Sequence, residues 1–315
     1  MINRGHLTVT RAYNQLLNDL LIQGETIAPR GQTCREIRGY SVELPYPRAN
    51  VVTCPVRAIN PHFLAAEFTW MFLGRRDVAS IAAYNKNIAA FSDDGETFFG
   101  AYGPRIVEQL PRVIELLKKD PDTRQAVISI FKSDATAVVT KDVPCTLAWQ
   151  FFVRSNQLEM HVTMRSNDAW LGFPYDVFNF TSFQRYVAWG VGVNVGRYVH
   201  TVGSMHLYER NVEKAAASVQ AFEKNEKTDG YLSQIFLDPS LRGTADDRQT
   251  PRILTQILDD LPTGKMLMWE ARAVVDQLPQ GWLRYGQLLV DRFDHDPGWL
   301  SPETRWLVER VRPAT

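Results

Sequence analysis

Residues 144–208 constrain the fold of this chain more than any other stretch. Two runs rich in apolar residues, 146–153 and 158–164, flank a short polar turn, which is typical of a β-hairpin. A long apolar helix at 179–191 and a further strand at 198–208 follow. A hairpin followed by a helix and a returning strand favours a β-sheet with helices packed against it.

The rest of the chain adds mostly helices. Apolar residues at helical spacing predict helices over about 7–23, 61–73, 77–90, 106–119, 212–226, 252–260 and 265–293. Other runs predict strands over about 36–58 and a central strand at 126–131, and a polar stretch predicts a loop over about 227–251. Because no linker or repeat separates these elements, we expect one α+β domain over residues 1–315.

Composition excludes several classes of protein. Hydrophobic residues make up 45% of the 315 residues, so a large core can form. The formal net charge is zero, which does not favour a binding surface for nucleic acid. No apolar run resembles a signal peptide or approaches the roughly 18 residues of a membrane span, so we expect a cytoplasmic protein.

The cysteines are Cys34, Cys54 and Cys145, an odd number at irregular spacing. This predicts reduced thiols rather than a disulfide framework, and no spacing of Cys or His is typical of a metal site. Cys145 follows a proline and precedes a strand. By itself it is either a nucleophile or a buried, inert thiol.

Several cations are candidates for binding an anion near Cys145. Arg165 and Ser166 offer a guanidinium and a hydroxyl, which match the oxygens of a phosphate, and Arg30 and Arg124 are candidates to join them. Cations near the thiol would favour its thiolate form. The alternatives are a structural ion pair for Arg165 and a solvated loop position for Arg30.

Glu67 lies in the apolar part of the helix predicted at 61–73. A carboxylate there either pairs with another group or has a raised pKa and a chemical role, unless it escapes to solvent. The aromatic and glycine residues at 98–103 suit a wall against a flat ligand, although they suit a core equally well.

Several separated motifs resemble the thymidylate synthase family over about residues 7–211. They are Glu67 to Gly74, Tyr102-Gly103, Pro144-Cys145, Arg165-Ser166-Asn167-Asp168, Leu171-Gly172-Phe173-Pro174 and His206-Leu207-Tyr208. The resemblance implies a three-layer fold with a mixed central sheet flanked by helices. It fades from about residue 212, where we expect a divergent, mostly helical part.

Four positions depart from the synthase pattern. Thr146 replaces a histidine, Asp176 an asparagine and Ser204 an aspartate, and Arg124-Gln125 replaces a pair of arginines. The first three, with the stretch 164–168, resemble the deoxycytidylate hydroxymethylase branch of the family.

The change at Asp176 has a direct physical meaning. Uracil offers an acceptor at O4 and a donor at N3, which an asparagine amide matches. Cytosine offers the reverse pattern, which a carboxylic acid with one proton matches. Mispaired buried groups cost a few kcal/mol, which gives roughly 100-fold discrimination. Unless Asp176 is a surface residue, it therefore favours cytosine.

The resemblance implies a covalent mechanism. The Cys145 thiolate would attack C6 of the pyrimidine, while Asp176 stabilises charge at N3 and Glu67 organises water and proton transfer. C5 would take a one-carbon unit from 5,10-methylenetetrahydrofolate. Water would then give a hydroxymethyl product.

The resemblance also implies binding roles. Phosphate would be held by Arg30, Arg165, Ser166 and Arg124, the last reaching across from a second subunit of a homodimer. His206 and Tyr208 would bind the sugar 3′-hydroxyl, and Gln150 is a further substrate-binding candidate. The folate would contact Phe91, Tyr102, Asp168 and Gly172.

Other functions remain open at this point. Hydride from the folate in place of water would make the chain a dCMP C5-methyltransferase. Phe91, where the family usually has tryptophan, and the tail at 309–315 bear on that choice. The substrate is dCMP or CMP, with dUMP, as in an ordinary thymidylate synthase, as an alternative. A catalytically dead nucleotide-binding protein is a further alternative.

Overall fold

The computed structural model describes residues 8–45, 47, 49–54, 56–136, 138–235, 249–294 and 296–311. Within them, the strands form one mixed six-stranded sheet in the order β1-β2-β6-β5-β4-β3. The strands are β1 (Glu25–Ile27), β2 (Cys34–Leu44), β3 (Val127–Ser129), β4 (Thr146–Arg154), β5 (Gln157–Asp168) and β6 (Asn194–Tyr208). Neighbours are antiparallel except β5 and β6, which are parallel.

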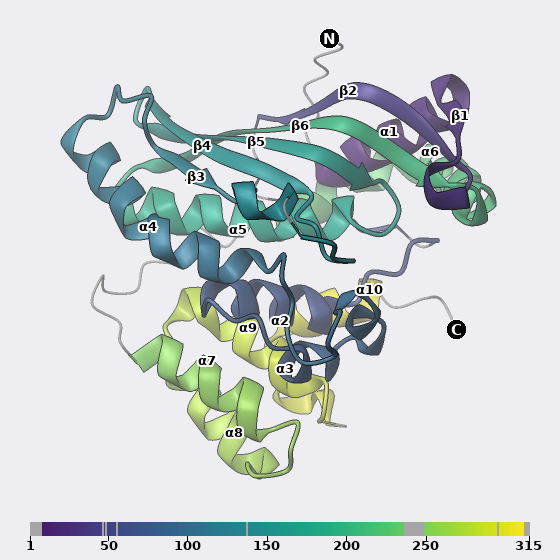
Figure 1. The fold of residues 1–315 in the computed structure, drawn as a ribbon. Coiled ribbons are helices and arrows are strands. Elements are labelled where there is room, and N and C mark those ends of the chain that lie inside the picture. The colour runs from purple at the N-terminus through teal and green to yellow at the C-terminus, as the bar shows by residue number, and fades with distance from the viewer. Residues whose placement is uncertain are drawn as a thin grey trace.

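The helices lie in two layers below the sheet in the view of Figure 1. They are α1 (Val9–Gln23), α2 (Pro61–Phe72), α3 (Val78–Ala82), α4 (Tyr102–Lys119), α5 (Phe173–Val191), α6 (Val212–Ile235), α7 (Gln249–Asp260), α8 (Met268–Val275), α9 (Gln280–Asp291) and α10 (Pro302–Val311). α1, α5 and α6 lie next to the sheet, and α2 with α7 to α10 lies beyond them (Figure 1). The predicted α+β fold is confirmed.

The hairpin of β4 and β5 depends on a tight turn. Ser155 and Asn156, between the paired residues Arg154 and Gln157, both have positive φ angles, 50° and 59°. Two consecutive residues of this kind make a turn whose twist matches that of the strands. The predicted hairpin is confirmed, and its other end carries Cys145 immediately before β4.

α5 connects the two parallel strands β5 and β6. It begins at Phe173 with Pro174 in its first turn, where a missing N–H has no consequence. It ends at Gly192, whose φ of 90° favours glycine. The ends of β5 and the first turn of α5 therefore lie close together, and both carry candidate site residues.

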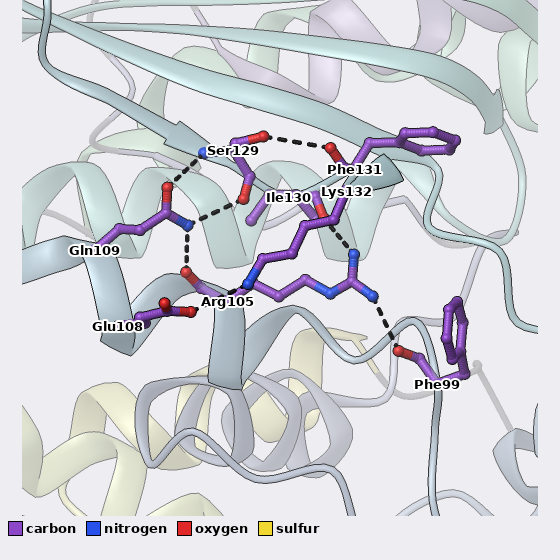
Figure 2. A network of polar contacts seen from close by, with 8 residues as sticks. All are labelled: Phe99, Arg105, Glu108, Gln109, Ser129, Ile130, Phe131 and Lys132. Atoms are coloured by element: carbon purple, nitrogen blue, oxygen red, sulfur yellow. Dashed lines mark hydrogen bonds and ion pairs between the residues drawn. The ribbon is translucent and has the colours of Figure 1, made fainter. Parts of the chain in front are cut away.

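Polar contacts fix α4 against β3 and the loop before α4 (Figure 2). The buried guanidinium of Arg105 donates to the main-chain carbonyls of Ile130 and Phe99. Gln109 both donates to and accepts from the main chain of Ser129. Through Phe99, this network holds Gly100, whose N–H donates to a carboxylate near the cysteine.

The C-terminal helices pack on α2 through paired charges. His62 of α2 and Asp291 of α9 lie 2.7 Å apart, between Nε2 and Oδ2. Arg75, just after α2, pairs with Asp77 and with Asp259 of α7. Among the described residues, no helix is long and apolar enough to span a membrane.

Some predicted elements differ from the structure. The helix predicted at 77–90 is wrong: α3 is short and a 3₁₀ turn, Lys86–Phe91, follows it, because the Asn85 side chain caps a new turn at Asn87. The strand predicted at 126–131 lies at the edge of the sheet rather than at its centre.

Two further boundaries differ. The strand pattern predicted over 36–58 is one strand that ends at Leu44. The helix predicted at 212–226 continues through Ile235, where a loop was expected. The rest of that predicted loop, 236–248, and the end of the tail, 312–315, lie outside the described residues.

Candidate active site

Cys145 lies between β4 and the end of a loop that Arg165 holds in place. The Arg165 N–H donates to the Cys145 carbonyl at 2.8 Å. Its guanidinium donates to the carbonyls of Pro144 and Val143, each at 2.9 Å, and its Nη2 lies 3.6 Å from the Cys145 sulfur. The predicted neighbourhood of a thiol and a guanidinium is thus present, and Arg165 is not in a structural ion pair with a described carboxylate.

The electrostatic balance at Cys145 differs from the expectation. Burial raises the pKa of the Cys145 thiol, Arg165 and Arg30 lower it, and Asp176 and Asp142 raise it. The two arginines thus favour the thiolate, as predicted, but burial together with the two carboxyls makes the net direction upward. The carboxyls at 142 and 176 offset the arginines.

Asp176 lies in the first turn of α5 and close to Cys145. Burial is the main cause that raises its pKa to about 7, partly opposed by a hydrogen bond from Asn167. The Asn167 amide nitrogen donates to Oδ2 of Asp176 at 2.7 Å. Asp176 is therefore not a surface residue, and near neutral pH a large fraction of it is a neutral acid.

Glu67 lies on α2 and approaches the same pocket from the helical layer. Burial, then the charge of Asp176, raises the pKa of Glu67 to about 8, against a hydrogen bond from Asn179. The Asn179 amide nitrogen donates to Glu67 Oε2 at 2.7 Å. Of the readings that the sequence left open, the buried carboxyl with a raised pKa is the one observed.

Asn179 is a neighbour that the sequence interpretation missed. It lies one turn after Asp176 on α5, at the spacing that puts two side chains on one face of a helix. A polar residue in an otherwise apolar helix was the available signal. Asp142 was missed too: burial raises its pKa to about 6, and it accepts a hydrogen bond from Gly100 at 2.7 Å.

The parallel pairing of β5 and β6 brings three candidate substrate residues together. Ser166 is opposite Ser204, and His206 is opposite Asp168. The Ser166 hydroxyl lies 3.4 Å from His206 Nδ1, and the His206 ring meets the Tyr208 ring edge-on with centroids 5.2 Å apart. These three side chains therefore form one cluster at the neighbouring ends of β5 and β6.

Arg30 lies on an exposed 3₁₀ turn, Pro29–Gly31, with a φ of 54° and ψ of 32°. A left-handed conformation is uncommon for arginine and is typical of functional loops. Its charge lowers the pKa of Cys145, so it lies within electrostatic reach of the thiol.

Arg124 and Gln150 belong to a different part of the sheet. Arg124 is exposed, and its main-chain carbonyl accepts from the Gln150 amide at 2.9 Å. Gln150 is opposite Val127 on the edge strand. In the described structure these two residues contact each other, and no hydrogen bond links either of them to the Cys145 cluster.

The predicted folate residues occupy varied positions. Tyr102 lies beside Cys145, because its hydroxyl accepts from the N–H of the next residue, Thr146, at 3.1 Å. Asp168 accepts from the N–H groups of Trp170 and Leu171, which fixes the turn before α5. Phe91 ends the 3₁₀ turn after α3 with 57% of its surface exposed.

The turn before α5 has the chemistry to hold a flat ring with an anionic tail. Leu171 is 48% exposed, next to Gly172. The guanidinium of Arg57 lies over the rings of Trp170 and Tyr175, 5.5 and 5.8 Å from their centroids, and donates to the Trp170 carbonyl. Arg57, which the sequence interpretation missed, adds a cation. These residues fit a folate.

Among the described residues, no three His, Cys, Asp or Glu side chains gather at a possible metal site.

Comparison with known proteins places these residues in context. A family described as thymidylate synthase matches residues 11–229. A deoxyuridylate hydroxymethyltransferase of Bacillus phage SP01 is 36% identical over 217 residues, which cover 63% of this chain and 57% of that protein. A protein of the same name from Pseudomonas phage M6 is 37% identical over 178 residues, which cover 54% and 51%. The chain thus spans about half the length of these relatives.

Proposed function

This chain belongs to the thymidylate synthase family, and from that premise we propose that it is a pyrimidine nucleotide 5-hydroxymethyltransferase with dCMP as its substrate. The observation that carries the choice of base is Asp176, a buried carboxyl whose pKa of about 7 leaves it able to hold a proton beside Cys145. The donor and acceptor of a neutral acid match N3 and the 4-amino group of cytosine.

In this proposal Cys145 is the nucleophile. Its thiol loses its proton as the sulfur bonds to C6, and the electron pair of the C5–C6 double bond makes C5 nucleophilic. Arg165, with Nη2 3.6 Å from the sulfur, stabilises negative charge there.

The two carboxyls then handle protons. Asp176 donates to N3 as charge develops on the ring. Glu67, which Asn179 holds at 2.7 Å, accepts the C5 proton through water and orients the water that completes the hydroxymethyl group. Bound 5,10-methylenetetrahydrofolate would supply the one-carbon unit and would leave as tetrahydrofolate after the C5 proton is lost, before water adds to the carbon left on C5. Arg57 and the turn at Trp170 to Gly172 would hold the folate, together with Tyr102 and Phe91. Expulsion of the Cys145 sulfur from C6 restores the aromatic ring.

We assign the phosphate to Arg30, Arg165 and Ser166, and the sugar 3′-hydroxyl to His206 and Tyr208. Arg124, which is exposed, would complete the phosphate site of a second subunit in a homodimer. Mixed dimers test this: an Arg124→Ala subunit paired with a Cys145→Ser subunit contains one intact site. Random mixing should then restore about a quarter of wild-type activity. No recovery on mixing would rule out a shared site.

Product masses test the function directly. The chain is incubated with 5,10-methylenetetrahydrofolate and dCMP, CMP or dUMP, and each nucleotide is weighed. Hydroxymethylation adds about 30 Da and methylation about 14 Da, so the two outcomes of the covalent mechanism separate cleanly. We expect the larger increment on dCMP. The smaller increment would identify a C5-methyltransferase instead.

A second candidate substrate is dUMP. The relatives from both phages carry the name deoxyuridylate hydroxymethyltransferase. A neutral Asp176 with its proton on the other oxygen would face uracil with the required acceptor and donor. A larger rate on dUMP than on dCMP would favour this candidate.

The nucleophile has its own test. A 5-fluoropyrimidine nucleotide with the folate should form a covalent adduct that intact mass detects, because fluorine cannot leave as a cation from C5. The adduct should be absent from Cys145→Ala. Its persistence in that variant would show that another residue attacks.

A further inference from the structure

A chain of buried hydrogen bonds leads to the Asp176 carboxyl. The Tyr198 hydroxyl lies 2.7 Å from His200 Nδ1, and His200 Nε2 lies 3.0 Å from Asn167 Oδ1. The Asn167 Nδ2 then donates to Asp176 Oδ2 at 2.7 Å. Tyr198 and His200 are fully buried and Asn167 is 3% exposed, so water does not compete for these contacts.

The donors in this chain all point toward Asp176. Burial lowers the pKa of His200 to about 3, so its ring carries one proton at neutral pH. Because Asn167 presents its oxygen to Nε2, that proton lies on Nε2, and Nδ1 accepts from Tyr198. Burial raises the pKa of Tyr198 well above its usual value, which keeps the hydroxyl a donor.

The orientation of the Asn167 amide decides what Asp176 presents to a ligand. A neutral carboxyl can carry its proton on either oxygen, so a freely titrating acid matches cytosine or uracil equally well. Donation from Asn167 favours an unprotonated oxygen at Oδ2. The proton then lies on Oδ1, the oxygen for which the structure shows no donor among the described residues.

We propose that Asn167, His200 and Tyr198 are positioning residues that fix the proton of Asp176 on Oδ1, and that Oδ1 faces N3 of the bound base, which makes this carboxyl selective for the cytosine edge. The proposal rests on the proposed function, since it explains the choice of base at the same site. Without these residues Asp176 still binds a pyrimidine, but it no longer distinguishes the two bases well.

The close approach of Asn167 and Asp176 to Gly172 is further evidence for the hydrogen bond between these two side chains. A Cβ on Gly172 would lie 2.9 Å from Asn167 Nδ2 and 3.3 Å from Asp176 Oδ2. The first distance is too short for a side-chain carbon, so only glycine leaves room for this hydrogen bond.

Binding selectivity tests the proposal without turnover. In a Cys145→Ser background, calorimetry gives the Kd for dCMP and for dUMP, and we expect dCMP to bind more tightly. Asn167→Leu, which removes the amide at similar volume, should reduce the ratio of the two affinities about 10-fold. Tyr198→Phe, at the far end of the chain, should reduce it about 3-fold.

Two substitutions at His200 distinguish a positioning role from a role in packing alone. His200→Gln keeps a donor near the place of Nε2, so it should retain most of the selectivity. His200→Leu lacks a donor and should lose it as Asn167→Leu does. Thr181→Val, which deletes a buried hydroxyl elsewhere on α5, is the control and should leave the ratio unchanged.

The outcomes are distinguishable. Suppose that the Cys145→Ser protein prefers dCMP, but that adding Asn167→Leu, His200→Leu or Tyr198→Phe leaves the ratio of its two affinities unchanged. The proposed positioning role is then overturned, while the assignment of dCMP as the substrate stands. If the Cys145→Ser protein prefers dUMP or neither nucleotide, the assignment of dCMP as the substrate fails, and the proposed positioning role fails with it. If a leucine variant does not fold, the affinity ratio of Tyr198→Phe is used to test the positioning role.

Discussion

The active-site pocket and the C-terminal helices both bury ionisable side chains, but they satisfy them differently. Against α2, the His62 ring meets the Asp291 carboxyl at 2.7 Å, and the Arg75 guanidinium meets the oppositely charged Asp259 carboxylate. In the pocket, by contrast, Glu67 and Asp176 receive hydrogen bonds from the amides of Asn179 and Asn167. An amide supplies a dipole but no charge.

That difference sets the protonation of the pocket. A nearby cation favours an ionised carboxylate, whereas an amide cannot offset the loss of water on burial. The pKa values of Glu67 and Asp176 therefore rise to about 8 and about 7. One region uses burial to hold the helices together, and the other uses it to keep protons available near neutral pH.

The largest expected effect is loss of proton transfer in the pocket. Glu67→Gln keeps the shape but cannot accept a proton, so kcat/KM on dCMP should fall about 1000-fold, equivalent to about 4 kcal/mol. Glu108→Gln, at an exposed ion pair with Lys132, is the control and should keep full activity. Activity of Glu67→Gln within about fivefold of wild type would contradict the assigned role.

In the other region, removal of a partner should affect stability alone. Asp291→Ala leaves His62 without its buried partner and should lower the free energy of unfolding by about 3 kcal/mol in urea titrations. Asp259→Ala, at a pair whose carboxylate is 42% exposed, should lower it by about 1 kcal/mol or less. A change in base selectivity in either variant would show that the two regions are coupled.

Replacing the acid that reads the base should alter selectivity. Asp176→Asn offers an amide that matches uracil, so the ratio of kcat/KM for dCMP over dUMP should fall about 100-fold, which corresponds to about 2.7 kcal/mol. Steady-state rates on both nucleotides give the ratio. An unchanged ratio would remove Asp176 as the base-reading residue.

The last comparison concerns the dependence of stability on pH. The pKa of Glu67 rises from 4.5 to about 8 on folding, so the folded chain retains a proton that the unfolded chain has lost. This stabilisation is complete below about pH 4.5 and is lost as the pH rises through about 8. Between about pH 5 and about pH 9, wild type should lose at least about 2 kcal/mol relative to Glu67→Gln. If urea titrations gave the same difference in free energy of unfolding between the two proteins at both pH values, the prediction would be contradicted.

Local patterns predicted much of the fold. The polar turn between two strands gave the hairpin, and apolar spacing gave α1, α2 and α5. The helix predicted at 77–90 failed because Asn85 binds the main chain of its own turn. The position of β3 at the sheet edge depends on pairing with β4, which no local pattern encodes.

Sequence motifs named several residues that the structure brings together near Cys145, but they did not predict the electrostatics of these residues. Burial of Glu67 follows from its apolar neighbours in sequence, yet its partner Asn179 is 112 residues away. The pair of His62 and Asp291 spans 229 residues. The net direction of the Cys145 pKa depends first on burial and then on the opposing charges of two arginines and two carboxyls, all of which are set only in the folded structure.

The return strand β6 has a consequence for synthesis of the chain. β6 pairs with β2, and it supplies His200 and His206 to the pocket, so the pocket cannot close until about residue 208 has left the ribosome. Cys145 emerges earlier, before the elements that bury it are complete. The nascent chain therefore exposes the Cys145 sulfur until β6 has joined the sheet.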